Sequence, residues 1–426
     1  MAESATLILR QGRILPAPAT PAVVEPMPVD IAIAGDRIVA IGPQLPLTAP
    51  EELDLQGQLI SPPFVESHIH LDSALTAGQP RWNQSGTLFE GIEIWGERKQ
   101  TLTLEDVMAR AITALKRQAQ QGVLYVRTHA DVSEPNLIPL KALLAVREAV
   151  KDWITVQVVA FPQDGLYSQP GQVDLLEEAL KLGADAVGGI PHYELMREDG
   201  VRSVQTIFDL AERYDRLIDI HCDEIDDDHS RFLEVVAAEA IRREMGTRVT
   251  ASHTTALGSY NNAYALKLMG FLRRAPINFV ANPLINLTLQ GRTDTYPKRR
   301  GLTRVKELWQ QGFNVSLGHD CIQDPWYSLG TGNLLDVAAM AVHACQMTGR
   351  DELQACYQMI THNGARTLHL QGNYGLAVGQ PANLIGLYTE DAITAIRDRA
   401  IVGTVISRGR KLTTTTPPQH TWHGLA

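Results

Sequence analysis

The chain reads Leu59-Ile60-Ser61-Pro62-Pro63-Phe64-Val65-Glu66-Ser67-His68-Ile69-His70-Leu71-Asp72 at the point that decides its fold. An apolar, β-prone run there leads into two histidines that stand two positions apart. Side chains alternate between the two faces of a strand, so His68 and His70 share one face. Two imidazoles on one face at the end of a buried strand can bind one metal ion. Two histidines in an ordinary β-turn would give the same local pattern, so the rest of the chain has to separate the two interpretations.

Seven further strands follow, and helical stretches separate them. The predicted strands are Leu59–His70, Val123–Asp131, Ile154–Gln163, Ala186–His192, Leu217–Cys222, Arg248–His253, Asn278–Leu284 and Asn314–Asp320. Apolar residues at spacings of three and four predict helices that include Pro139–Val150, Val173–Leu182, Ser203–Tyr214 and Ser230–Glu244. The glycines expected just after helices are Gly122, Gly183, Gly246 and Gly312. Eight strand–helix repeats predict a (β/α)₈ barrel of the TIM type, with an open doubly wound sheet as the alternative.

The two ends of the chain have a different sequence pattern, in which glycines interrupt short predicted strands. These strands are expected at Thr6–Leu9, Asp30–Gly42, Ala382–Tyr388 and Ile401–Leu412. We expect segments 1–58 and 370–426 to pair into one small composite β-sandwich, beside a catalytic barrel of residues 59–369. Pro16–Pro28 is expected to be a proline-rich surface loop.

Composition narrows the class of protein. Of the 426 residues, 44% are hydrophobic and 20% charged, which is ordinary for a soluble globular protein with a large core. The net charge of −10 argues against a nucleic-acid partner. Met1–Thr6 does not resemble the start of a signal peptide, and no apolar run is long enough to span a bilayer, so no membrane partner is expected. The four cysteines form no Cys-x-x-Cys pair, which suits reduced thiols in a cytoplasmic protein.

Polar residues gather at the predicted strand ends. Seven of the 13 histidines fall there, namely His68, His70, His129, His192, His221, His253 and His319. A single histidine at such a position is more often a packed core residue than a ligand, but seven are harder to dismiss. Gln163, Glu224 and Asp320 stand at or just after the same strand ends. Imidazoles together with one carboxylate form a good site for zinc or iron, and barrels of this kind carry catalytic groups at these ends.

This pattern resembles the amidohydrolase superfamily, in which a His-x-His pair follows strand one, histidines follow strands five and six, and an aspartate follows strand eight. More narrowly, the chain resembles bacterial cytosine deaminases over nearly its whole length. The most specific stretches are Val159-Ala160-Phe161-Pro162-Gln163 and His221-Cys222-Asp223-Glu224-Ile225-Asp226-Asp227. The others are Pro62–Asp72, Gly78–Gly91, Ala251–Ala256 and Asp324–Tyr327. The terminal segments match the composite β-sandwich of that family.

The resemblance implies a hydrolytic deaminase of free pyrimidine bases that releases ammonia and forms a homo-oligomer. One divalent ion per chain, zinc or iron, would be bound by His68, His70, His221 and Asp320. Asp320 would also accept a proton from the attacking water, which His253 would orient. Glu224 would carry protons to and from the base. Gln163 would bind the pyrimidine edge in a pocket lined by Leu88 and Trp326. We expect the remaining strand-end histidines, His129, His192 and His319, to be structural.

Cys321 departs from the family pattern, because cytosine deaminases carry a second aspartate directly after the metal-binding one. In the family this side chain flanks ring C5 of the base. Cysteine is uncharged and behaves as a small hydrophobe, so a methyl group on C5 would gain roughly 1 kcal/mol from burial beside it. We therefore predict that 5-methylcytosine is a substrate and gives thymine. Conversion of cytosine to uracil alone is the alternative.

Two other functions fit the same residues. Isoguanine and isocytosine share the N–C–N–C=O arrangement that Gln163 and Glu224 would bind, so deamination of another heterocycle is one alternative. A non-catalytic metal-binding scaffold is a remote one, because such proteins usually lack some ligands. Two loops can be interpreted from their own sequences. Gly78–Gly91 is long enough to act as a lid, and Pro297–Gly301 is expected to be a solvated helix start rather than a phosphate site.

Overall fold

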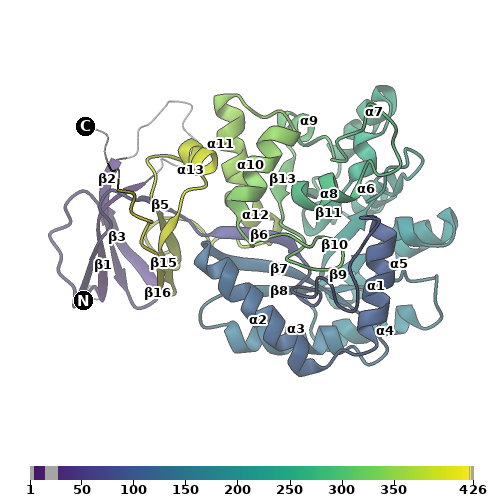
Figure 1. The fold of residues 1–426 in the computed structure, drawn as a ribbon, viewed down its shortest axis with the longest axis horizontal. Helices are drawn as coiled ribbons and strands as arrows, with labels where there is room; N and C mark the ends of the chain where they lie inside the picture. Colours follow the sequence, from purple (N-terminus) through teal and green to yellow (C-terminus); the bar gives the residue numbers. More distant parts are fainter. Residues whose placement is uncertain (1–3, 15–26, 422, 424–426) are drawn as a thin grey trace.

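In residues 4–14, 27–421 and 423, which the computed structural model describes, the larger sheet is a barrel of eight parallel strands (Figure 1). Its strands in chain order are β6 (Phe64–Ile69), β7 (Val123–Asp131), β8 (Thr155–Phe161), β9 (Ala186–Gly189), β10 (Leu217–Cys222), β11 (Val249–His253), β12 (Asn278–Ala281) and β13 (Asn314–Leu317). The barrel closes where Ile69, at the end of β6, bridges Asp320 in parallel.

Helices surround this barrel (Figure 1). They are α1 (Leu88–Lys99), α2 (Leu104–Gln120), α3 (Ile138–Val150), α4 (Gln172–Lys181), α5 (Arg197–Tyr214), α6 (Phe232–Arg242), α7 (Asn262–Leu272), α8 (Pro283–Leu289), α9 (Val305–Gln310), α10 (Leu334–Ala344), α11 (Arg350–Met359) and α12 (His362–Thr367). Helix α2, for example, packs an apolar face against β7. In α2 that face is Val107, Ala111 and Ala114, and Thr103 caps the helix by accepting from Asp106 N.

All eight predicted barrel strands are present, but some of their limits were wrong. The first predicted strand is two strands, because Pro62 and Pro63 separate β5 (Leu59–Ser61) from β6. The seventh ends at Ala281, since Pro283 begins α8. Proline lacks an amide N–H and suits the first turn of a helix, so both errors arise where proline interrupts an apolar run. The fourth strand ends before His192, which lies in the short 3₁₀ helix Pro191–Tyr193.

Three of the four predicted helix-ending glycines are confirmed. Gly122, Gly183 and Gly312 have φ angles of +85°, +110° and +82°, in the left-handed region. Gly246 was predicted wrongly, because the left-handed residue after α6 is Glu244, with φ of +55°. A Cβ atom at Gly246 would lie 2.6 Å from Cδ of Pro276, so close approach of another segment explains the glycine there.

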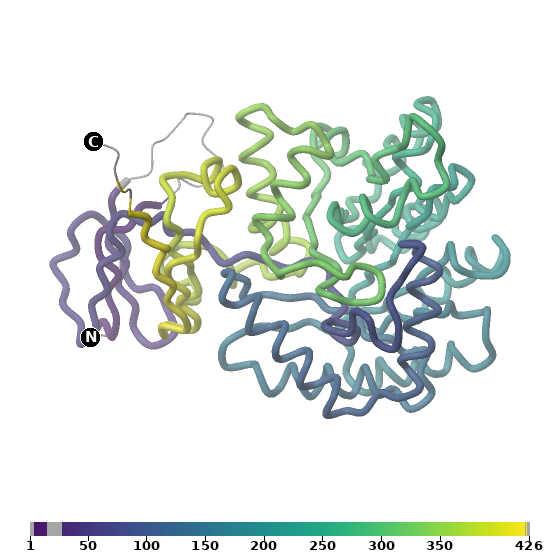
Figure 2. Tube along the Cα trace, viewed as in Figure 1, coloured from purple at the N-terminus to yellow at the C-terminus, as the bar shows by residue number. Residues whose placement is uncertain are grey.

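A second sheet is built from both ends of the chain. Its strand order is β16-β15-β14-β5-β1-β2-β3, with β4 beside β1. The strands not yet given are β1 (Leu7–Ile14), β2 (Met27–Ala34), β3 (Arg37–Gly42), β4 (Glu51–Asp54), β14 (Leu384–Leu387), β15 (Val402–Ser407) and β16 (Arg410–Thr414). Helix α13 (Ala392–Asp398) connects β14 to β15 and packs against α10 and α11. The trace in Figure 2 shows the purple and yellow ends of the chain together at one side of the barrel.

The two sheets confirm the predicted fold class. The limits of the two domains, at 58/59 and 369/370, stay a prediction. The expected loop Pro16–Pro28 lies outside the described residues except for its last two, which begin β2. Among the helices of the described residues, none combines the length and apolar character that crossing a membrane requires.

Candidate active site

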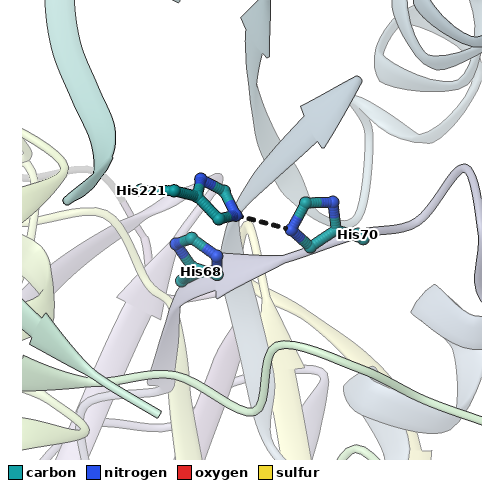
Figure 3. A group of neighbouring side chains, drawn as sticks. All are labelled: His68, His70 and His221. Carbon is teal, nitrogen blue, oxygen red and sulfur yellow. Dashed lines mark hydrogen bonds between the residues drawn. The ribbon is translucent and has the colours of Figure 1, made fainter. Parts of the chain in front are cut away.

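Three imidazoles meet at the carboxyl ends of the barrel strands (Figure 3). His68 lies in β6, His70 directly follows it, and His221 lies in β10. The Nε2 atoms of His70 and His221 are 3.0 Å apart. Two imidazole nitrogens bound to one tetrahedral zinc ion, at about 2.0–2.1 Å each, would lie about 3.3 Å apart. The two nitrogens are therefore already spaced like ligands of a single ion.

Asp320 joins this group because the barrel closes there. Its backbone N–H donates to His68 O, and its carbonyl accepts from His70 N, both at 2.9 Å. Its carboxylate Oδ1 lies 3.6 Å from His68 Nε2 and 3.5 Å from His70 Nε2. Asp320 has a φ angle of +68°. This left-handed conformation is strained for any residue other than glycine, and such strained residues are common at functional sites. A Cβ atom at the nearby Gly318 would lie 2.9 Å from His68 O, so this close approach needs glycine.

The charge states of these groups suit metal binding. Burial and neighbouring imidazoles hold the pKa values of His68, His70 and His221 well below the ordinary histidine range. The neutral imidazole is the form with a free lone pair, which a metal needs. His68 Nε2 is fully buried and has no hydrogen-bond partner among the described residues. This unpaired nitrogen, beside two more imidazoles and a carboxylate, fits a divalent ion such as zinc or iron.

Glu224 and His253 form a second group beside the first. Glu224 follows β10, and His253 ends β11 with a φ angle of +66°. His253 Nδ1 lies 3.1 Å from Glu224 Oε1, and its Nε2 lies 3.7 Å from Asp320 Oδ2. Burial lowers the pKa of His253, but the carboxylates of Glu224 and Asp320 outweigh it and raise this pKa to about 9. Burial, assisted by the carboxylate of Glu224, raises the pKa of Asp320 to about 8.

Asn286 on α8 connects Glu224 to His253, and no sequence motif singled it out. Its Nδ2 donates to Glu224 Oε1 and lies 3.1 Å both from that oxygen and from His253 Nδ1. The residue is fully buried. The one available signal was a lone amide inside the apolar run Leu284–Leu289. The predicted strand Asn278–Leu284 includes the start of this run, so it does not reveal the helical face that Asn286 shares with Leu289.

One cavity adjoins both groups. Its lining residues are His70, Leu88, Gln163, Ile190, His221, Glu224, Ile285, Leu289, Asp320, Cys321 and Trp326. The residues that we expected at a substrate, Gln163, Leu88, Cys321 and Trp326, are therefore together on its wall. The sequence did not identify Ile190, Ile285 and Leu289 as pocket residues. An apolar residue of a pocket wall and one of the core look alike in a sequence. Burial raises the pKa of the Cys321 thiol well above its usual value, so this side chain carries no charge.

Helix α1 contributes Leu88 to the cavity wall and is held against the barrel. Trp95 Nε1 donates to Asp131 Oδ2 at 2.8 Å, and Lys99 Nζ lies 3.1 Å from the same oxygen. Lys99 also pairs with Asp164 at 2.7 Å. Asn83, in the preceding loop, donates to Pro325 O at 3.1 Å. The loop that we expected to act as a lid therefore packs against the chain next to Trp326, and its movement stays a prediction.

The other strand-end histidines lie outside the two groups. His319 accepts from Gly332 N through Nε2 and contacts Cys321 O through Nδ1 at 2.8 Å, so both nitrogens serve the loop after β13. The ring of His129 packs against that of His68, with the two ring centroids 4.1 Å apart. His192 has two buried nitrogens with no hydrogen-bond partner among the described residues.

The basic stretch Pro297–Gly301 was expected to start a helix, and that expectation was wrong. Helix α9 begins only at Val305. Arg299 instead pairs with Asp294 Oδ2 at 2.7 Å and donates to Ser259 Oγ at 2.8 Å. Asp226, in turn, accepts from Gly291 N at 2.7 Å. These contacts hold the loop after α8 against the loop after β10. The positive charge of Arg299 is therefore paired within the protein.

Comparisons with known proteins find relatives over most of the chain. A sequence model described as the amidohydrolase family matches residues 51–422. The structure superposes with a TM-score of 0.92 on a 5-methylcytosine deaminase from Klebsiella pneumoniae crystallised with phosphonocytosine. The two sequences are 47% identical, over 97% of this chain and 100% of that one.

Two curated proteins are more distant relatives. An N-isopropylammelide isopropyl amidohydrolase from Pseudomonas sp. strain ADP is 30% identical, over 89% of this chain and 92% of its own length. A pterin deaminase from Rhizobium rhizogenes is 29% identical, over 84% of this chain and 82% of its own length. The first is named for amidohydrolase activity on N-isopropylammelide, and the second for deamination of a pterin.

Proposed function

The chain belongs to the amidohydrolase family, and on that premise we propose that it is a metal-dependent hydrolytic deaminase of free pyrimidine bases. We propose 5-methylcytosine as a substrate, converted to thymine with release of ammonia, with cytosine to uracil as the related reaction. One observation carries the proposal. One cavity is lined both by the proposed metal ligands His70, His221 and Asp320 and by a second set of residues. That second set suits a 5-methylated pyrimidine and consists of Gln163, Glu224 and Cys321.

The metal would be one divalent ion per chain, zinc or iron, held by His68, His70, His221 and Asp320. When bound, such an ion lowers the pKa of water from about 15.7 toward about 7 and supplies hydroxide at neutral pH. The end of β9 carries Ile190, Pro191 and His192 and no lysine, so no bridging group for a second ion is expected there. Three imidazoles and one carboxylate suit both metals, and metal analysis of the purified protein identifies the one bound.

The side chains of the site would move protons and position the base. Glu224 would protonate ring N3, which makes C4 electrophilic, while Asp320 accepts a proton from the attacking water. The oxygen of that water forms the new bond to C4. Glu224, ionised by that first transfer, would take the remaining proton of the water from the new hydroxyl on C4 and deliver it to the exocyclic nitrogen. The C4–N bond then breaks with loss of ammonia, C4 becomes a carbonyl, and the proton held by Asp320 restores Glu224 for the next turnover. His253 would orient the water. The amide of Gln163 both donates and accepts, so it can pair with N1 and O2 of the ring.

The proposed preference for a 5-methyl group rests on Cys321. Its thiol is uncharged and lies on the cavity wall together with Leu88 and Trp326. A methyl group beside these side chains gains roughly 1 kcal/mol from burial, which corresponds to about a fivefold preference. The relative with 47% identity is named as a 5-methylcytosine deaminase, and it was also crystallised with 5-fluorocytosine. Both facts support a site that accepts substituents on C5.

Ammonia release should be measured for cytosine, 5-methylcytosine, isocytosine and isoguanine with one enzyme preparation of known metal content. We expect kcat/KM for 5-methylcytosine to be at least equal to that for cytosine, and both to exceed the other two bases. The pterin deaminase relationship makes isocytosine and isoguanine the natural competitors, because they carry the same ring pattern. Absence of turnover with both cytosines would contradict the proposed substrate class.

The variant Cys321→Asp tests the origin of the preference within that experiment. A carboxylate beside C5 should lower the ratio of kcat/KM for 5-methylcytosine over cytosine by at least about fivefold, since the methyl group then meets a charge rather than apolar surface. Cys321→Ser is the matched control, because it is small and uncharged and should keep the ratio within about twofold. An unchanged ratio in Cys321→Asp would assign the preference to another residue.

Asn286→Ala should lower kcat by roughly 10- to 100-fold with little change in bound metal. A hydrogen bond to a charged group is worth about 1.5–3 kcal/mol, and Asn286 is the donor that Glu224 and His253 share. The measurement is steady-state turnover together with metal content. Thr288→Ala on the same helix is the control, because its hydroxyl bonds only within α8, to Leu284 O. A normal kcat in Asn286→Ala would mean that Glu224 holds its position without this amide.

Three further expectations from the sequence stay predictions. These are assembly as a homo-oligomer, the absence of a nucleic-acid partner and a cytoplasmic location. The oligomeric state can be measured directly by light scattering.

A further inference from the structure

A chain of buried polar groups runs from His68 through the interior of the barrel. His68 Nδ1 lies 3.1 Å from the hydroxyl oxygen of Ser252. The Ser252 hydroxyl donates to Asp219 Oδ1 at 2.7 Å. Arg127 Nη1 donates to Asp219 Oδ2 at 3.0 Å. None of these four residues has measurable exposure to solvent.

The register of two neighbouring strands brings these groups together. In the parallel pair β10 and β11, Ser252 stands opposite His221. Asp219 lies two positions before His221 on β10 and therefore faces the same side of the sheet. The strands that present His221 and His253 thus also supply the groups that contact His68. The sequence did not single out Ser252 or Asp219, because their meeting depends on this register.

The direction of each hydrogen bond follows from the chemistry of the partners. A guanidinium group only donates, so Asp219 Oδ2 accepts from Arg127. A hydroxyl has one proton, and that of Ser252 points to Asp219 Oδ1. Ser252 can then offer only a lone pair to His68. The proton of the neutral His68 ring must therefore sit on Nδ1, and the lone pair must sit on Nε2.

This assignment explains the unpaired nitrogen of the site. Nε2 of His68 is the buried atom without a hydrogen-bond partner among the described residues, and it faces Asp320 Oδ1 at 3.6 Å. We propose that Ser252 and Asp219 are positioning residues that hold His68 in the tautomer and orientation needed to bind the metal ion. The proposal rests on the metal site proposed above. Partners of this kind behind a metal-binding histidine are commonly worth 10- to 100-fold in metal affinity.

The test is zinc affinity, measured by competition with a chelator and without reference to turnover. Ser252→Ala should raise the dissociation constant for zinc by about 10- to 100-fold. Ser316→Ala is the matched control, a fully buried serine of barrel strand β13 whose hydroxyl contacts Phe279 O and Thr367. It should change the constant by less than about twofold. An unchanged constant in Ser252→Ala, with tight zinc binding by the natural protein, would overturn the role of Ser252. Failure of the natural protein to bind zinc or iron would overturn the proposed metal site itself.

A second measurement needs no variant and therefore does not depend on whether Ser252→Ala folds. Neutron diffraction of the zinc-loaded protein should show deuterium on His68 Nδ1, and the Ser252 deuterium directed to Asp219. A Ser252 deuterium directed to His68 would reverse the inferred order of donors and overturn the proposal.

Discussion

Glu224→Gln should lower turnover of the preferred base by about 10²- to 10⁴-fold, the range that a positioned general acid or base contributes. The amide keeps the shape of the side chain and can still contact His253 and Asn286. It cannot give a proton to ring N3 or to the departing amine, so binding of the base should change far less than kcat. The measurement is steady-state ammonia release, with KM and kcat determined separately.

The control for this variant is Glu148→Gln, the same change on α3, where 63% of the side chain is exposed. It should keep full activity. Metal content should be equal in both variants and in the natural protein, because Glu224 is not among the proposed ligands. A Glu224→Gln enzyme that keeps more than about a tenth of the natural kcat would mean that another group carries the protons.

His221→Ala should abolish both bound metal and activity, with a fall in kcat/KM of at least about 10³-fold, since a catalytic metal supplies several kcal/mol. The substitution removes one of the three imidazoles of the proposed site, and with it the nitrogen that lies 3.0 Å from His70 Nε2. Metal content by atomic emission and ammonia release are the two measurements. Circular dichroism separates metal loss from unfolding.

His343→Ala is the matched control, because this histidine is exposed and its Nδ1 contacts only Ala339 O within α10. It should keep both metal and activity. The natural protein allows an independent test. Removal of its metal with a chelator should abolish turnover, and addition of zinc or iron should restore turnover. Full activity in metal-free natural protein would contradict the proposed reaction more directly than any variant.

Much of the candidate site could be predicted because its residues follow local rules. The alternation of side chains along β6 places His68 and His70 on one face, and strand-end positions bring His221, Glu224 and Gln163 to the same end of the barrel. The resemblance to cytosine deaminases then assigned each of them a role. The errors in strand limits arose near Pro62, Pro191 and Pro283, where the predicted strand continues but the observed strand ends.

The sequence by itself determined which chemical groups stand at the carboxyl ends of the strands, because strand–helix order and side-chain alternation are properties of neighbouring residues. Only the tertiary structure decided which of these groups meet. Asp320 reaches His68 and His70 because β13 and β6 close the barrel, Ser252 reaches His68 through the register of β10 and β11, and Asn286 reaches Glu224 because α8 begins directly after β12. Each of these contacts joins residues far apart in the chain, so it depends on how the strands close and align rather than on any local pattern.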